Sequence, residues 1–150
     1  MTSLHHNGIE IIARGIITDG VRILLNAPNQ NPVPYYYLPG GHVEFGETGE
    51  ECLQRECLEE TGETISSVHY LTTIENFFTD YNGEHHEINL IYAAEIQNTK
   101  FLDIVSKESH IVFKAVELSK LHDIRLVPSQ IAKFVLHYLN NGGYRNIGQR

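Results

Sequence analysis

The sequence predicts an α+β domain, an α/β/α sandwich in which a mixed sheet lies between helices. Three observations support this prediction. The expected elements follow the order strands, helix, strands, helix, which is typical of a sheet covered by helices. The 150 residues suit a single domain spanning 1–150, and neither a repeat nor a linker divides them. Hydrophobic residues make up 41% and charged residues 20%, the balance of a folded globular chain.

Three strands are expected in the first third of the chain. They lie at residues 8–18, 21–26 and 35–38. The stretches are rich in isoleucine, leucine or tyrosine, which favour strands. Asp19-Gly20 between the first two is typical of a two-residue hairpin. Proline and amide residues in 27–34 indicate a loop, and Pro39-Gly40-Gly41 is expected to end the third strand in a turn.

The clearest helix is expected at residues 47–61. This segment is rich in Glu, Leu, Gln and Arg, contains no proline and stops before Gly62. Thr48 is a candidate N-cap, and Glu51 three residues later completes a capping-box pattern. Leu53 and Cys57 share one side of the helix, so Cys57 is expected to be a small core residue.

The second half of the chain predicts more strands and a last helix. Strands are expected at 65–79 (one or two strands), 87–96 and 110–116, with a hairpin turn at 81–84. The turn is expected because it contains Asn82-Gly83. Apolar residues at helical spacing predict a helix at 128–139, which the Asn- and Gly-rich stretch 140–143 stops.

Three glutamates gather on one strip of the 47–61 helix. An α-helix turns by about 100° per residue, so Glu56, Glu59 and Glu60 lie within an arc of roughly 100°. Like charges at this spacing repel each other. The arrangement therefore favours a bound cation, and hard cations such as Mg²⁺ take carboxylates, waters and substrate phosphates as ligands.

The residues around this strip fit an anion and metal site. Arg55 is four residues before Glu59 and can pair with it. The glycines of Pro39-Gly40-Gly41 allow a ligand or metal to approach the backbone closely. The positive end of the helix favours Glu47 and also a phosphate group.

The segment from Gly41 to Glu63 resembles the Nudix box. This motif is a Gly, five residues, a Glu, seven residues, then Arg-Glu, an apolar residue, any residue, Glu-Glu, any residue, Gly and an apolar residue. The matching positions are Gly41, Glu47, Arg55, Glu56, Glu59, Glu60 and Gly62. Cys57 is a mild departure at an apolar position. Glu63 is a stronger one, and Ile65 is expected to supply the missing apolar contact.

The resemblance implies the Nudix fold and a Mg²⁺-dependent hydrolase, with Mn²⁺ able to replace Mg²⁺. Nudix enzymes split the diphosphate linkage of a nucleoside diphosphate derivative and release a monophosphate product. By resemblance, the metal ligands are the Gly41 carbonyl, Glu47, Glu56, Glu59 and Glu60. The catalytic residues are Glu59, which orients or deprotonates the water, and Arg55, which orients the glutamates. Glu108 on a later loop is the candidate general base.

Aromatic residues outside the box are candidates for substrate binding. Strand alternation places Tyr35 and Tyr37 on one face. Tyr37 and Phe77 could stack on a base, and His86 could contact substrate. The simpler interpretation of each aromatic is ordinary strand packing. His85 and His86 point to opposite faces of a strand, so they are not expected to chelate zinc together.

Charge and composition narrow the partners. Eleven Lys and Arg against 19 Asp and Glu give a net charge of −8, which argues against broad nucleic-acid binding. Two cysteines, no visible signal peptide and no long apolar stretch predict a cytoplasmic protein without a membrane span.

Several functions stay open at this point. The resemblance implies a small-molecule phosphoanhydride substrate of nucleotide, nucleotide-sugar or ADP-ribose type. Dinucleoside polyphosphates, oxidised nucleoside triphosphates and diphosphates of non-nucleosides also stay open, because the residues do not select among them. A Nudix module that senses a nucleotide without cleaving it is one alternative, and an RNA-end processing hydrolase is another. The family is often dimeric, so a homodimer is also open.

Overall fold

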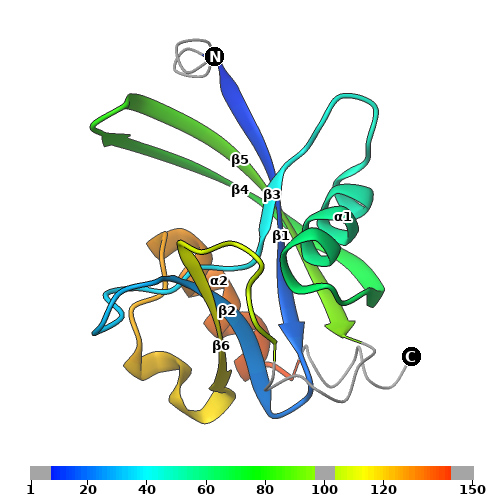
Figure 1. Cartoon of the computed structure of the whole chain (residues 1–150), viewed down its shortest axis with the longest axis vertical. Helices are drawn as coiled ribbons and strands as arrows, with labels where there is room; N and C mark the ends of the chain where they lie inside the picture. Colours follow the sequence, from blue (N-terminus) through cyan, green and yellow to red (C-terminus); the bar gives the residue numbers. More distant parts are fainter. Residues whose placement is uncertain (1–7, 97–103, 143–150) are drawn as a thin grey trace.

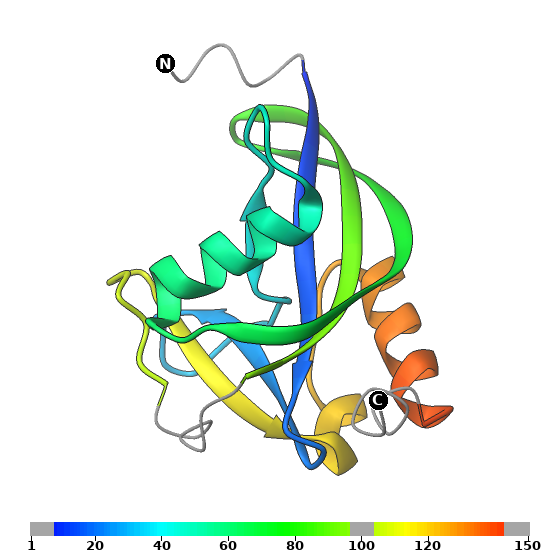
Figure 2. The same cartoon turned by 90° about the vertical axis from the view of Figure 1, so that its right-hand side faces the viewer.

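The computed structural model describes residues 8–96 and 104–142 of the chain. They form a six-stranded sheet with one α-helix on each face (Figures 1 and 2). The elements are β1 (Ile9–Thr18), β2 (Arg22–Pro28), β3 (Gly40–His42), α1 (Gly49–Thr61), β4 (Ile65–Asp80), β5 (Gly83–Ile96), β6 (Ile111–Glu117), the 3₁₀ helix η3 (Leu118–Asp123) and α2 (Ser129–Asn140). The predicted α/β/α arrangement is confirmed.

The sheet is mixed because β1 runs parallel to β5 and antiparallel to β2 and β3. The strand order is β4-β5-β1-β2-β6, with β3 paired to β1 beside this path. β1 is thus an inner strand of the sheet. Its isoleucine-rich sequence suits this position, since side chains from both of its faces enter a core.

Two hydrophobic cores lie on opposite faces of the sheet. On one face, Ala13 and Ile17 of β1 pack with the α1 residues Leu53 and Cys57. On the other, Ile16 packs in a cluster with three apolar residues of α2, namely Ile131, Val135 and Leu139. Cys57 is a buried free cysteine in the first core, as predicted. Neither α-helix is long and apolar enough, within the described residues, to cross a membrane.

Helix α1 has the ends that its sequence predicts, with a start two residues later than expected. The Thr48 hydroxyl accepts a hydrogen bond from the Glu51 amide at 3.1 Å and caps the helix. Gly62 ends it with a left-handed backbone (φ 77°), and its amide donates to the Leu58 carbonyl. Ile65 lies in the same core cluster as Cys57, so it supplies the apolar contact that Glu63 does not.

The strand predicted at 35–38 is wrong. Its residues make two isolated bridges, Tyr37 with Asn26 and Tyr36 with Leu126. The pairing with β1 falls instead on Gly40–His42, where a turn was expected. A Cβ on Gly40 would overlap the Ala13 carbonyl, so glycine allows β3 to lie this close to β1.

The β4–β5 hairpin is longer than predicted. β4 is one continuous strand, and β5 begins at Gly83, four residues earlier than expected, because the Asn82-Gly83 turn pairs Asp80 directly with Gly83. The helix η3 was not predicted. In Figure 2 the turn of the β4–β5 hairpin lies near the start of β1, and α2 lies toward the other end of that strand.

We predict that Leu53→Ala lowers the free energy of unfolding by about 2–5 kcal/mol, because it leaves a cavity under α1 where Leu53 is fully buried. Leu58→Ala is the matched control: the same change on the same helix, at a half-exposed side chain. It should cost well under about 1.5 kcal/mol. Urea unfolding with a common m-value measures both, and equal losses would contradict the packing described for α1.

Candidate active site

The three glutamates of the α1 strip differ in exposure. Glu60 is buried, the Glu56 side chain is mostly buried and the Glu59 side chain is more than half exposed. Glu56 lies directly beneath the backbone of β3. A Cβ added to Gly41 would overlap the Glu56 carboxylate, so glycine is required where the strand crosses the helix.

Arg55 holds the loop before α1 to the helix. Its guanidinium donates twice to Glu47, at 3.0 and 2.7 Å, in a bidentate pair. These bonds hold the pKa of Glu47 down at about 2. Arg55 also donates to Glu56 at 3.0 Å and to the His42 carbonyl at 3.2 Å. The predicted pair with Glu59 is present but longer, at 3.4 Å.

The charged form of Glu60 is poorly stabilised by its surroundings. Its burial, and then the negative charges of Glu56 and Glu108, raise its pKa to about 8. Its Oε2 atom is buried and has no hydrogen-bond partner within the described part of the chain. A hydrogen bond from the buried Asn26 side chain acts in the opposite direction and favours the charged form.

The loop that carries Glu108 is attached to the end of α1. The Lys107 amide donates to the Glu60 carbonyl at 3.0 Å, and the Glu108 charge contributes to the raised pKa of Glu60. The Glu108 side chain is partly exposed and lies 3.5 Å from His110. The structure therefore brings this predicted residue to the glutamate cluster, although it is 48 positions from Glu60 in the sequence.

Arg14 and Asn26 belong to the same region and were not predicted. Arg14 donates from Nε to Asn89 at 2.9 Å and from Nη1 to the Leu38 carbonyl at 3.2 Å. The charges of Glu87 and Glu60 both act on its guanidinium. Arg14 is a polar residue within the apolar strand β1, and Asn26 is one within β2. A polar residue inside an apolar strand is the sequence signal that could have identified both as site candidates.

A cavity of about 660 Å³ opens next to Arg14. Its sheet side is formed by Arg14, Asn76 and Glu87, and its other walls by the aromatics Tyr35, Tyr37, Phe77 and Phe78 and by residues 127–130 at the start of α2. Glu87 is buried and accepts a hydrogen bond from Asn76 at 3.3 Å. The predicted residues Tyr37 and Phe77 therefore lie at one cavity. Tyr35 and Tyr37 both face it, as their alternation predicts.

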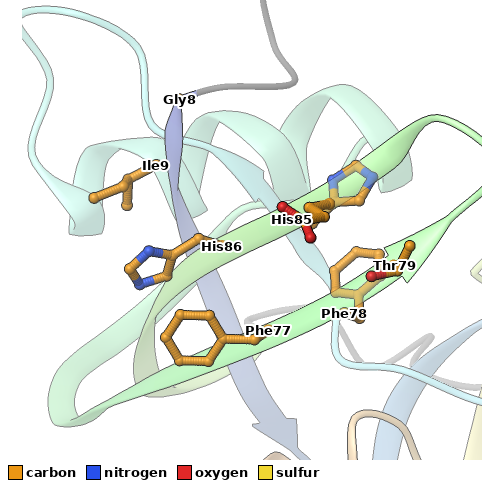
Figure 3. A pocket seen from close by; sticks show the side chains of 8 residues that line it. Gly8, Ile9, Phe77, Phe78, Thr79, His85 and His86 are labelled. Carbon is orange, nitrogen blue, oxygen red and sulfur yellow. The ribbon is translucent and has the colours of Figure 1, made fainter.

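His86 lies outside this cavity. It borders a second hollow of about 560 Å³ at the hairpin, together with Phe77 and Ile9 (Figure 3). Its Nε2 is 2.9 Å from a Glu75 carboxylate oxygen, and its ring centre is 4.3 Å from that of Phe77. His85 points to the other face and stacks on Phe78, which fits the expectation that the two histidines do not chelate together.

The residues present fit a hard divalent cation. Within 8–96 and 104–142, no three His, Cys, Asp or Glu side chains already surround one point as metal ligands would. The carboxylates of Glu47, Glu56 and Glu59 instead converge on Arg55. The unpartnered Glu60 oxygen, the adjacent Glu56 and the oxygen-only donor set are what Mg²⁺ prefers.

Comparison with known proteins identifies the family. A family model described as the NUDIX domain matches residues 11–138. The chain belongs to the NUDIX domain family. The Nudix resemblance of residues 41–63 is thereby confirmed, and the chain is a Nudix pyrophosphohydrolase by family.

Solved Nudix structures share the fold at low identity. A MutT NUDIX hydrolase from Burkholderia pseudomallei is 22% identical, with a TM-score of 0.66, over 87% of this chain and 98% of its own. A NUDIX-family hydrolase from Clostridium perfringens is 17% identical, with a TM-score of 0.67, over 87% and 95%. A NUDIX hydrolase from Nitrosomonas europaea is 15% identical, with a TM-score of 0.66, over 90% of both chains.

We predict that Glu60 makes the metal-free protein less stable as the pH rises. The pKa of Glu60 is about 8 in the folded chain, and its ordinary value, taken for the unfolded chain, is 4.5. Between these two pH values the folded chain therefore keeps a proton that the unfolded chain has released. This stabilisation is complete below about 4.5 and lost above about 8. The gain in unfolding free energy from Glu60→Gln should therefore grow with pH over that window.

Thermal unfolding in EDTA, with wild type and Glu60→Gln at matched pH values, measures this difference. Mg²⁺ added at the upper end of the window should raise the melting temperature of the wild type and leave Glu60→Gln nearly unchanged. If the stability difference between the wild type and Glu60→Gln does not change with pH, the raised pKa of Glu60 is contradicted.

Proposed function

We propose that this Nudix protein hydrolyses, with Mg²⁺, the diphosphate linkage of a nucleoside diphosphate derivative of nucleotide, nucleotide-sugar or ADP-ribose type, and releases a monophosphate product. Mn²⁺ can replace Mg²⁺ in this proposal. The observation that carries it is Glu60, a buried carboxylate with an unpartnered oxygen beside Glu56 in the Nudix motif. A cluster of this kind is costly unless it holds a cation.

Each box residue has a proposed role. Glu56, Glu59, Glu60 and the Gly41 carbonyl would hold the metal. Glu47 is an outer ligand, whose orientation Arg55 sets through its bidentate pair. When bound, Mg²⁺ would neutralise the diphosphate and lower the pKa of the attacking water.

The proton of the water goes to a carboxylate at the edge of the cluster. Glu108 and Glu59 are the two candidates, since both are partly exposed and lie beside the buried glutamates. Because Glu108 lies on a loop held to the Glu60 carbonyl through Lys107, it stays close to the site without being part of α1. We favour Glu108 as the general base.

The cavity beside Arg14 suits the group attached to the diphosphate. Arg14 lines this cavity, and the charges of Glu87 and Glu60 both act on its guanidinium. Tyr37 and Phe77 offer aromatic faces for a planar ring. His86 is reached only by a substrate that extends past Phe77 towards the hairpin hollow.

We predict that Glu60→Gln and Glu56→Gln each reduce turnover by at least roughly 100-fold, because a neutral amide cannot replace a carboxylate ligand. Glu51→Gln is the matched control on an exposed part of the same helix and should retain near-normal rates.

The assay follows phosphate release from a panel of nucleoside diphosphate and triphosphate derivatives with Mg²⁺ and with Mn²⁺, with and without added phosphatase. Near-normal rates in both site variants would refute the proposal. Tight nucleotide binding without any product would point to the sensor alternative, and a strong preference for a capped oligonucleotide would point to RNA-end processing.

We predict that Glu108→Gln lowers kcat by roughly 100-fold or more while KM changes little, since a general base acts in the transition state. Steady-state kinetics tests this, with Glu59→Gln in parallel. A loss confined to Glu59→Gln would assign the base to Glu59 instead.

A further inference from the structure

Glu87 is a buried acid whose charge has little to stabilise it. The residue is 8% exposed, lies on β5 and lines the cavity beside Arg14. Asn76 donates one hydrogen bond to its Oε1 atom, at 3.3 Å. Within residues 8–96 and 104–142, no other group donates to this carboxylate and no base pairs with it. A buried carboxylate is costly unless it is well paired or hydrogen-bonded, so Glu87 has acceptor capacity left for a ligand.

The neighbouring acid on the same face of the sheet has two bases beside it. Glu10 stands next to Glu87 in the register of β1 with β5. One Glu10 oxygen lies 2.9 Å from His42 and the other 3.1 Å from His85. Glu87 has the neutral amide of Asn76 in place of such bases. The two acids therefore differ, and the one that lines the cavity is the less compensated.

Arg14 borders the same cavity but spends its hydrogen bonds elsewhere. Its Nε donates to Asn89 at 2.9 Å and its Nη1 to the Leu38 carbonyl at 3.2 Å. Burial lowers the pKa of its guanidinium, and the charge of Glu87 opposes this shift more than any other charge does. The acid and the base are thus neighbours without a direct hydrogen bond. A ligand that carries donors next to an acceptor can contact both.

The cavity has the size and the walls for a ring that reaches Glu87. Its volume of about 660 Å³ is that of a small-molecule site. Aromatic side chains line it opposite a polar surface, which suits a flat group bound by its faces and read at its edge. The aromatic residues are Tyr35, Tyr37, Phe77 and Phe78.

The chemistry of a carboxylate restricts what this edge can be. Ionised Glu87 only accepts hydrogen bonds, and its two oxygens can accept from two adjacent donors at once. Guanine presents N1–H and the 2-amino group side by side, with O6 as the next acceptor. Adenine and cytosine each present one amino group flanked by acceptors, and uracil one N–H between two carbonyls. The 2′,3′-diol of ribose is the other group in a nucleotide with two adjacent donors.

We propose that Glu87 determines the specificity of the cavity, by accepting two hydrogen bonds from a substrate group that presents two adjacent donors. The group is the guanine edge or the ribose 2′,3′-diol, which share this chemistry. Asn76 is a positioning residue, because its amide holds one oxygen of the carboxylate. The inference rests on the proposed hydrolysis, since it states which diphosphates bind for cleavage.

The first test compares substrates that differ by one donor, with the wild-type chain and Mg²⁺. The base pair of compounds is GDP and IDP, since hypoxanthine lacks the 2-amino group of guanine. The sugar pair is GDP and 2′-deoxy-GDP. We expect kcat/KM to fall by at least about 10-fold within one pair, because a hydrogen bond to a charged group is lost. The pair that shows the fall identifies the group that Glu87 binds.

The second test asks whether Glu87 causes the preference. Glu87→Gln offers one acceptor and one donor in place of two acceptors, so the ratio within the sensitive pair should fall to near one. The ratio is the readout because this change also removes a negative charge and alters the affinity for every diphosphate. Glu95→Gln is the matched control: the same change on the same strand, at a residue that does not line the cavity. It should keep the wild-type ratio.

Calorimetry with uncleavable α,β-methylene analogues of the same compounds separates this inference from the hydrolysis. If the wild type cleaves none of the diphosphates, the proposed hydrolysis fails, and the ratios of Kd still decide the role of Glu87. Equal affinities within both pairs would overturn the proposal without any variant, even if Glu87→Gln does not fold. A preference that persists unchanged in folded Glu87→Gln would overturn it as well.

Discussion

The Arg55 guanidinium is the contact on which the site depends. It joins the loop after β3 to the middle of α1 through Glu47, and at the same time holds Glu56 in place. Without this cation, the carboxylates of the strip would repel each other and splay apart. Arg55 neutralises only part of the cluster, because Glu60 is buried away from it and keeps an unpartnered oxygen. The partial neutralisation leaves room for a second positive charge.

Burying Glu60 destabilises the fold electrostatically and at the same time forms a site suited to a cation. Burial next to Glu56 and near Glu108 disfavours the charged form of Glu60, as its raised pKa shows. A well-packed apolar residue at this position would make α1 more stable and would remove the chemistry. The glycine at Gly41 is part of the same compromise, since any side chain there would push the Glu56 carboxylate out of place.

The glutamate strip could be predicted from the sequence because it depends on local geometry. Helical spacing alone puts Glu56, Glu59 and Glu60 together, and the cap at Thr48 is equally local. Arg14 and Glu108 could not be placed on the cluster in this way, because strand pairing and a loop contact across the fold bring them there. The strand wrongly expected at 35–38 has the same cause: tyrosine-rich residues favour a strand, but the position beside β1 fits the glycine backbone of β3.

The first residues of β1 show where sequence periodicity stops being informative. The odd positions of β1 carry Ile9, Ile11, Ala13 and Ile17, so residue type alone does not separate the two exposed side chains from the two buried ones. What separates them is that α1 begins over Leu90 and Tyr92 and covers nothing beyond. On the opposite face of the sheet, Glu10 pairs with His42 and His85. Exposure at this end of the sheet therefore depends on how far α1 reaches, which the sequence of β1 alone does not contain.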